Sequence, residues 1–565
     1  MKMKNRVLSC LLATLTAFSL IACGTVADPN SNSSSVPSSS NGESSESSGG
    51  SSGENTRPAG KKIVLYVGGS SEYSIVKGTE EDKVVEAIEQ KYYEDTGISL
   101  DFNVAFLGMN MKDRLTASLA GGDQVDMAIS HSRTGTGIDD YAISNSCYYD
   151  LADLIDSYGD NIYDNSDLDI MTTVNQEIIA FPSYVNPYKY GILVRKDYME
   201  ATGYTDNAND AAEKGLKLLS CVEDFEDMCI KMRSKDVTGL DKDSAYSLSG
   251  AIWDVEKVFA GAFSNAGYWN YTEVLNDKGE IVKVLPGYAT PAYEKLAKLE
   301  YDWVNKGIIS KESFVYNLSQ LEGSFISGQT GVMVGDPTID HLIEVARKTK
   351  ANIPEAEFTV IGPLAMKDTP DQKGFIRPTA GYMAGVVMKT SKNAKDIVQF
   401  VDWMYSDEDN YSLCRLGIEG EHWINNGDGT YSYPAGKEEY LLNAPYSGAL
   451  SIVENQMISN LVYNGYTEEE KTWINLAQNK ANYVVNDTVD FIMPVTEALG
   501  TSHTDALNNF YTGVAKNVWT GETNPLSIMD GKTRVALYQE LYLQQDKDYL
   551  EYLVSKYKLM KQSRI

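Results

Sequence analysis

Three short apolar segments near the start of the globular part of the chain predict β-strands. They are KKIVLYVGG, which ends in a glycine turn, ISLDFNVAF, which alternates strictly between apolar and polar positions, and VDMAIS. Two segments with helical spacing lie between them: one follows the Thr79-x-x-Asp82 cap pattern and ends at Gly97, and the other is MKDRLTASLAGG. This alternation of strand and helix predicts an α/β fold with a parallel, doubly wound sheet.

Such a sheet binds ligands in the crevice beyond the carboxyl ends of its strands. Here those ends fall at residues 68–74, 108–110 and 130–133. The side chains predicted to contact a ligand at this edge are Ser71, Tyr73, His131 and Arg133. His131 and Arg133 could equally cap a strand or form a surface ion pair, and Tyr73 could cover local core.

The first 60 residues have a different pattern. Basic residues precede an apolar run from Val7 to Leu20, as in a secretory signal, and this run is too short to span a bilayer. It ends in Leu20-Ile21-Ala22-Cys23, which resembles the lipobox of bacterial lipoproteins, so that Cys23 is the predicted lipidation site and new N-terminus. The alternative is an ordinary signal with a chance cysteine. The serine-rich stretch up to residue 60 predicts a flexible tether for residues 23–60.

Charge and cysteine usage narrow the class of protein. The formal net charge of the 565-residue chain is −30, which argues against nucleic-acid binding, since that rests on neutralising phosphates. Cys221 and Cys229 fall in one helical segment, about 12 Å apart, too far for a disulfide, and no disulfide framework is predicted. The four histidines are far apart in the sequence, and zinc-binding spacings are missing. No metal and no cofactor is predicted.

Several longer segments then resemble one family in their order and spacing. The chain is similar to bacterial extracellular solute-binding proteins of family 1, the capture components of ABC importers, over most of residues 61–435. The last of its segments is similar to a long lipoprotein subgroup of Gram-positive bacteria. The segments are LTASLAGGDQVDMAIS, IIAFPSYVNPYKYGILVRKDYMEATG, FISGQTGVMVGDP, AGYMAGVVMKTSKNAKDIVQFVDWMYSDED and GIEGEHW.

The resemblance implies a two-lobed α/β fold of the type II periplasmic-binding-protein kind, with a hinge between the lobes. We expect lobe 1 at residues 61–182 and 335–387, and lobe 2 at residues 183–334 and 388–565. It also implies a monomer that meets an ABC permease, performs no chemistry and touches the membrane only through its lipid anchor, on the extracellular face of the cell.

Further ligand contacts are expected where the chain passes between lobes and in turns of lobe 2. The two tryptophans lie in turns bordered by glycine and serine, where no core stripe is evident, and loops often carry function. Asp336 follows the strand GVMVG of the returning segment. Each of the other candidates of this group could instead have a structural role. These candidates are Tyr184, Trp253, Trp269, Asp336, Arg377 and Tyr382.

The 37 tyrosines and seven tryptophans favour a small polar ligand, most simply an oligosaccharide, because flat aromatic faces suit sugar rings. A peptide or another solute, a ligand-sensing role and a surface glycoside hydrolase remain alternatives. Glu419 and Glu421 in GIEGEHW are weak evidence for glycosidase chemistry, and we interpret this segment as a structural loop. NNGDGTYSY is interpreted first as a hairpin turn and only second as a calcium site.

Overall fold

The computed structural model describes the chain from Arg57 onward, and these residues belong to one compact unit, Asn55–Ile565. Within the part of the chain that the structure describes, no helix is both long and apolar enough to cross a membrane. The described residues are 57–69, 72–108, 110–131, 138–165, 177–183, 186, 188–240, 246–264, 271–377, 383–441, 444–451, 455, 457–459, 461–484 and 497–563.

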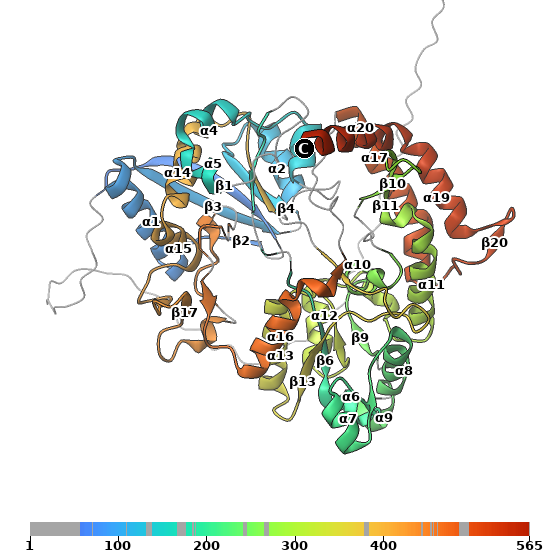
Figure 1. The fold of residues 1–565 in the computed structure, drawn as a ribbon. Coiled ribbons are helices and arrows are strands. Elements are labelled where there is room, and N and C mark those ends of the chain that lie inside the picture. The colour runs from blue at the N-terminus through green and yellow to red at the C-terminus, as the bar shows by residue number, and fades with distance from the viewer. Residues whose placement is uncertain are drawn as a thin grey trace, which may run out of the picture. The chain divides into compact units, whose positions relative to one another are not determined.

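The first sheet contains the three strands predicted from the apolar pattern (Figure 1). β1 lies between β3 and β4 and is parallel to both, as expected for a doubly wound sheet. β2, β15 and β5 add antiparallel neighbours. In sheet order the six strands are β2 (Glu72–Ser74), β3 (Leu100–Gly108), β1 (Lys61–Gly68), β4 (Met127–His131), β15 (Met383–Val387) and β5 (Phe181–Pro182).

The helix predicted after Thr79 is confirmed as α1 (Glu80–Thr96). The Thr79 side chain accepts a hydrogen bond from the Asp82 backbone N–H, and Gly97 ends the helix in the left-handed region. The buried face of α1 packs in the core of the first sheet, together with the apolar sides of α14 and α15. The remaining helices of this part are α2 (Met111–Gly121), α3 (Ile138–Ser144), α4 (Ala152–Tyr158), α5 (Asp160–Asn165), α14 (Ala394–Tyr405) and α15 (Glu408–Leu416).

A second sheet has the order β13-β6-β12-β9. β6 alternates across its two faces: Leu193 belongs to a core with α13 and α16, whereas Ile192 and Val194 belong to a larger core with α8, α10 and α11. Both faces of this sheet are therefore covered by helices. The elements are β13 (Phe358–Ile361), β6 (Ile192–Arg195), β12 (Val332–Met333), β9 (Leu248–Ser249), α6 (Lys196–Ala201), α8 (Val222–Met232), α10 (Ile252–Phe259), α11 (Pro291–Asn305), α12 (Leu318–Ile326), α13 (Ile339–Asn352) and α16 (Glu468–Gln478).

The C-terminal helices pack on the larger core of the second sheet, where Trp519, Tyr542 and Leu553 are buried. α17 also contacts α3 of the first part, and α20 contacts the β10–β11 hairpin. These elements, with the small strand pairs and short helices, are α17 (Glu497–Phe510), α18 (Lys516–Trp519), α19 (Arg534–Gln545), α20 (Lys547–Ser563), β10 (Tyr271–Leu275), β11 (Ile281–Pro286), β14 (Phe375–Ile376), β19 (Tyr483–Val484), β16 (Ile424–Asn425), β17 (Thr430–Ser432), β18 (Val462–Tyr463), β7 (Tyr204–Thr205), β8 (Lys217–Leu218), β20 (Ile528–Met529), β21 (Lys532–Thr533), α7 (Ala208–Lys214) and α9 (Lys235–Thr238).

The packing differs from the expected lobe boundaries in two places. Residues 335–387 were expected in lobe 1, yet β13 pairs with β6 of the second sheet and α13 packs on the same sheet. Residues 388–565 were expected in lobe 2, yet α14 and α15 cover the first sheet. The reason is that strand pairing across long sequence distances decides which sheet a segment joins. Three segments pass between the part of the first sheet and the part of the second: from β5 to β6, from β14 to β15 and from α15 to α16.

Candidate ligand site

The carboxyl ends of the parallel strands meet at one edge of the first sheet, as the pattern predicts. Gly68 at the end of β1 pairs with Gly108 at the end of β3, and His131 ends β4 beside Met383. Tyr73 lies at this edge on β2, and its ring stacks on Phe106 with centroids 4.3 Å apart and an interplanar angle of 9°. Burial raises the pKa of the Tyr73 hydroxyl, although 39% of the residue is exposed. Tyr73 therefore presents part of an aromatic ring at the predicted edge.

Trp253 lies in helix α10, so the expectation that it sits in a turn is wrong. The helix buries Val255 and Phe259, and this apolar stripe is easy to miss because Gly250 precedes the helix and Gly261 follows it. Trp253 is half-buried and makes an edge contact with Trp519, the ring centroids being 6.3 Å apart. One side of Trp253 therefore packs on core, and its contact with a ligand stays a prediction.

Asp336 follows β12 with a φ of 42°, in the left-handed region that few non-glycine residues adopt. It lies near α10, because its charge helps to raise the pKa of Asp254 on that helix. Burial is the larger cause of this shift, and Lys257 Nζ opposes it from 2.8 Å. The structure thus brings Asp336 close to the helix that carries Trp253.

Arg377 lies directly after β14, in the segment that returns to the first sheet. Its Cζ atom is 6.0 Å from the ring centroid of Tyr188, which lies in the segment from β5 to β6. Tyr188 makes an edge contact with Tyr483 of β19, and β19 pairs with β14. Lys480 Nζ lies 5.3 Å from the same Tyr188 ring. Tyr188 and Lys480 were not among the predicted site residues. Tyr188 follows the candidate Tyr184 closely, whereas no motif in the sequence near Lys480 points to a ligand.

The backbone just after α10 lies close to the backbone just before β14. A Cβ atom added to Gly261 would lie 1.9 Å from the carbonyl oxygen of Gly374, so only glycine fits there. This contact links the helix of Trp253 to the strand that leads to Arg377. The remaining candidates lie outside the described residues and stay predictions: Cys23, Ser71, Arg133, Tyr184, Trp269 and Tyr382, together with the side chain of His131.

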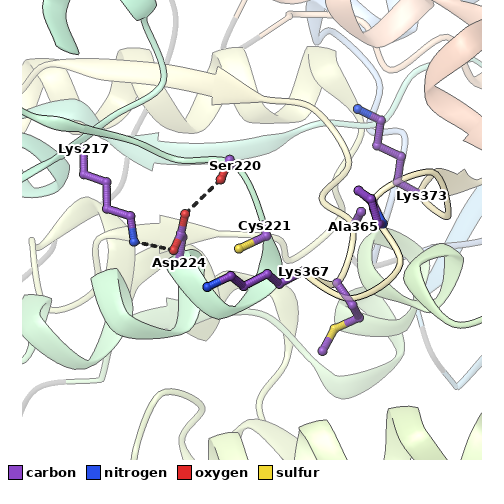
Figure 2. Close-up of a pocket in the computed structure, with 9 residues that line it drawn as sticks. Lys217, Ser220, Cys221, Asp224, Ala365, Lys367 and Lys373 are labelled. Carbon is purple, nitrogen blue, oxygen red and sulfur yellow. Dashed lines mark hydrogen bonds and ion pairs between the residues drawn. The ribbon is translucent and has the colours of Figure 1, made fainter. Parts of the chain in front are cut away.

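A pocket of about 360 Å³ lies where α8 begins, and no predicted site residue lines it (Figure 2). Lys217 Nζ lies 2.6 Å from Asp224 Oδ1, and the Ser220 hydroxyl donates to the same carboxylate. Burial raises the pKa of the Cys221 thiol at its wall, which keeps this sulfur protonated and poorly nucleophilic. All four described cysteines have free thiols.

A second pocket, of about 470 Å³, lies between α13, α16 and β13. Arg347 spans its wall and binds Glu470 through two nitrogen–oxygen contacts of 2.7 Å each. These contacts lower the pKa of Glu470 even though its burial acts in the opposite direction. Arg347 and Glu470 of this wall are therefore already paired within the protein.

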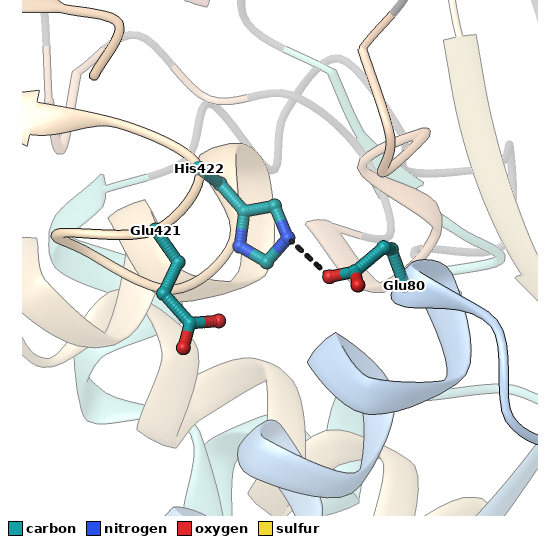
Figure 3. A group of neighbouring side chains, drawn as sticks. All are labelled: Glu80, Glu421 and His422. Carbon is teal, nitrogen blue, oxygen red and sulfur yellow. Dashed lines mark ion pairs between the residues drawn. The ribbon is translucent and has the colours of Figure 1, made fainter. Parts of the chain in front are cut away.

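Glu80, Glu421 and His422 lie close enough together to suggest a metal site (Figure 3). The His422 Nδ1 atom, however, accepts a hydrogen bond from the Ile418 backbone N–H at 3.0 Å, so the neutral ring carries its proton on Nε2, which faces Glu80 Oε2 at 3.5 Å. Glu421 pairs with Lys83. Both nitrogens are thus engaged, and these residues do not fit a metal ion.

The bonds within residues 417–432 are those of local loop structure. Trp423 Nε1 donates to the Gly417 carbonyl at 2.8 Å, and Glu419 Oε1 accepts from the Asn425 N–H at 3.3 Å. The predicted hairpin turn is confirmed: β16 and β17 pair around it, and Asp428 Oδ1 accepts from the Thr430 N–H at 3.0 Å. This Asp428 oxygen is used by the turn itself.

Comparison with known proteins places this geometry in context. Residues 77–411 match the family described as bacterial extracellular solute-binding protein. The lipoprotein LipO of Bacillus subtilis is 24% identical over 266 residues, 44% of this chain and 49% of that protein. The polygalacturonan/rhamnogalacturonan-binding protein YtcQ of Bacillus subtilis is 22% identical over 327 residues, 57% of this chain and 60% of that protein. The chain thus spans about half the length of one curated relative and three-fifths of the other.

Solved structures agree on the fold. The N-glycan transport solute-binding protein NgtS from Streptococcus pneumoniae aligns with a TM-score of 0.57 at 15% sequence identity. The alignment covers 89% of this chain and 100% of NgtS. At this identity the likeness shows the two-lobed α/β fold, which is the fold expected from the sequence.

Proposed function

The chain belongs to the bacterial extracellular solute-binding proteins, and from that premise we propose that it captures an oligosaccharide outside the cell for an ABC importer. Two similar proteins support a saccharide, since YtcQ is a polygalacturonan/rhamnogalacturonan-binding protein and NgtS is an N-glycan transport solute-binding protein. The observation that carries the proposal is the meeting of Tyr188 and Arg377, which lie on two of the segments that pass between the two parts. Ligand sites form preferentially where domains meet, and a half-buried tyrosine offers a sugar an apolar face.

Tyr73 supports the same proposal from the first sheet, because it presents a stacked, partly exposed ring at the carboxyl edge. We assign the ligand to the space between that edge and the segments of Tyr188 and Arg377. The two lobes close over it by a hinge motion, which shifts the protein towards a closed state.

We propose that the protein binds its ligand and does not catalyse a reaction on it. A glycoside hydrolase needs two carboxyl groups that face a substrate. Among the described residues, Glu419 is engaged in a loop bond, Glu421 pairs with Lys83 of α1, and Glu256 and Glu300 are buried in the core. None of these pairs faces an open site.

The test uses the chain from Gly24 onward in calorimetric titrations with oligosaccharides and peptides. We expect saturable binding of an oligosaccharide and no new reducing ends after long incubation. Binding of peptides alone would contradict the choice of ligand. Sustained release of reducing ends would show an enzyme instead.

The location outside the cell rests on a lipid anchor at Cys23. LipO, one of the similar proteins, is by name a lipoprotein. Two acyl chains on one residue give stable attachment, and an acidic body adds none. We therefore expect Cys23→Ala to release the protein from the membrane pellet into the soluble fraction, whereas Cys221→Ala should leave it in the pellet. Retention of the Cys23→Ala protein in the pellet would remove the anchor from the proposal.

A further inference from the structure

The ring of Tyr188 has two cations beside it. Arg377 Cζ lies 6.0 Å and Lys480 Nζ 5.3 Å from its centroid. Tyr188 is half-buried and held by the edge contact with Tyr483, whose hydroxyl accepts from the Tyr190 N–H at 2.6 Å and donates to the Ala477 carbonyl at 2.7 Å. The ring therefore has a fixed position, and positive charge collects around it.

Tyr204 is the matched case elsewhere in the chain, because two lysines also lie beside its ring. Lys217 Nζ is 5.3 Å and Lys231 Nζ 5.1 Å from that centroid. Each of these lysines is neutralised within the protein: Lys217 pairs with Asp224 at 2.6 Å, and Lys231 pairs with Asp227 at 2.7 Å. At Tyr204 the protein itself thus supplies a carboxylate for each cation.

At Tyr188 the balance differs. Among the residues that the structure describes, no carboxylate pairs with Lys480, which is exposed. The chain as a whole carries a net charge of −30, so a cationic group at this place would attract an anion that the rest of the surface repels. Both cations lie within about 6 Å of the same ring centroid, so an anion held against that ring would be attracted by each of them.

We propose that the ligand is an acidic oligosaccharide whose uronate carboxylate binds Lys480 and Arg377, with the apolar face of a sugar ring against Tyr188. This inference rests on the proposed function and names its substrate class. The guanidinium group of an arginine can donate two parallel hydrogen bonds to one carboxylate. The ammonium group of a lysine attracts the same carboxylate as a point charge. Neutral sugars offer this pair of cations no matching charge.

The experiment compares a panel of oligouronates with carboxyl-reduced counterparts, which keep the same linkages but lose the charge. Calorimetry on the chain from Gly24 onward should show at least one oligouronate binding about tenfold or more tightly than its reduced form. Its affinity should fall as salt rises from 0.05 to 0.5 M. Lys480→Gln should weaken the acidic ligand about tenfold and leave the reduced ligand unchanged.

Lys437→Gln is the matched control, because Lys437 also lies beside a tyrosine ring, with its Nζ atom 5.1 Å from the Tyr440 centroid. We expect the Lys437→Gln protein to bind the acidic ligand as tightly as the unmodified protein does. Arg377→Gln provides a second variant, checked by its melting temperature. Tight binding of neutral oligosaccharides with no acidic preference would overturn this inference and leave the proposed function standing. An acidic preference unaffected by both substitutions would overturn the assignment to these residues. Failure to bind any saccharide would remove the proposed function, and this inference with it.

Discussion

Glu89 and the pair Glu256 and Glu300 are all buried glutamates, but they differ in the partners that surround them. Glu89 Oε1 accepts from the Phe102 N–H at 2.6 Å, and Oε2 pairs with the Arg57 guanidinium. Three of the four carboxyl oxygens of Glu256 and Glu300 have no partner among the described residues. The fourth accepts from Trp519 Nε1 at 3.2 Å.

The difference appears in the ionisation of the two sites. Burial raises the pKa of Glu89 to about 7, although Arg57 and the Phe102 N–H oppose the rise. Burial also raises the pKa of Glu256 and Glu300 well above the ordinary range, and the charge of Glu300 adds to the shift at Glu256. A cation and a backbone donor thus offset part of the desolvation cost, and a lone indole N–H offsets little.

The largest effect is expected from Arg57→Ala, because it removes the cation that supports ionised Glu89. We expect a loss of about 2–4 kcal/mol in unfolding free energy at pH 8. The loss should be smaller at pH 5, where Glu89 is protonated. Denaturant titrations at both pH values measure it. Lys471→Ala, in an exposed pair with Glu468, is the control and should cost below about 0.5 kcal/mol. Equal losses in the two variants would contradict the comparison.

A smaller effect is expected in the pH dependence that Glu89 itself contributes. Its folded pKa of about 7 lies above the unfolded value of 4.5, so the folded state binds the extra proton. The contribution to stability is full below pH 4.5 and is lost as the pH rises through 7. Between pH 5 and 8, the unmodified protein should lose about 2 kcal/mol relative to Glu89→Gln. Parallel stability profiles of the two proteins would show that Glu89 does not titrate in this range.

The smallest effect is a gain from Glu256→Gln. The neutral amide removes the cost of holding a proton on a buried carboxyl group that the unfolded chain ionises, and we expect about 1 kcal/mol of added stability at pH 8. The gain should shrink towards pH 5, where the unfolded chain also begins to hold this proton. Thermal melts at the two pH values measure it, with the exposed Glu213→Gln as control. Destabilisation at pH 8 would mean that Glu256 has a partner that stabilises its charge.

Local signals predicted the first sheet well. The strands of residues 61–130 and the Thr79 cap depend on neighbours in the sequence, and each was found where the pattern placed it. Trp253 was misplaced in a turn because its packing partner, Trp519, lies far along the chain. The contact between Tyr190 and Tyr483 joins residues 293 positions apart, and it helps to hold Tyr188 near Lys480. The pattern of apolar and polar residues within one short segment cannot predict contacts between residues so far apart in the sequence.

The antiparallel strand β15 has a consequence for how the chain folds. It pairs with β4, and the nearby bond from the Ser391 hydroxyl to Asp126 closes a loop of 265 residues. The four strands of the second sheet, by contrast, all lie between Ile192 and Ile361. A chain that emerges from its N-terminus can therefore complete the second sheet while β4 still has an open edge. Late, long-range closure slows folding and leaves that edge available for aggregation until β15 arrives.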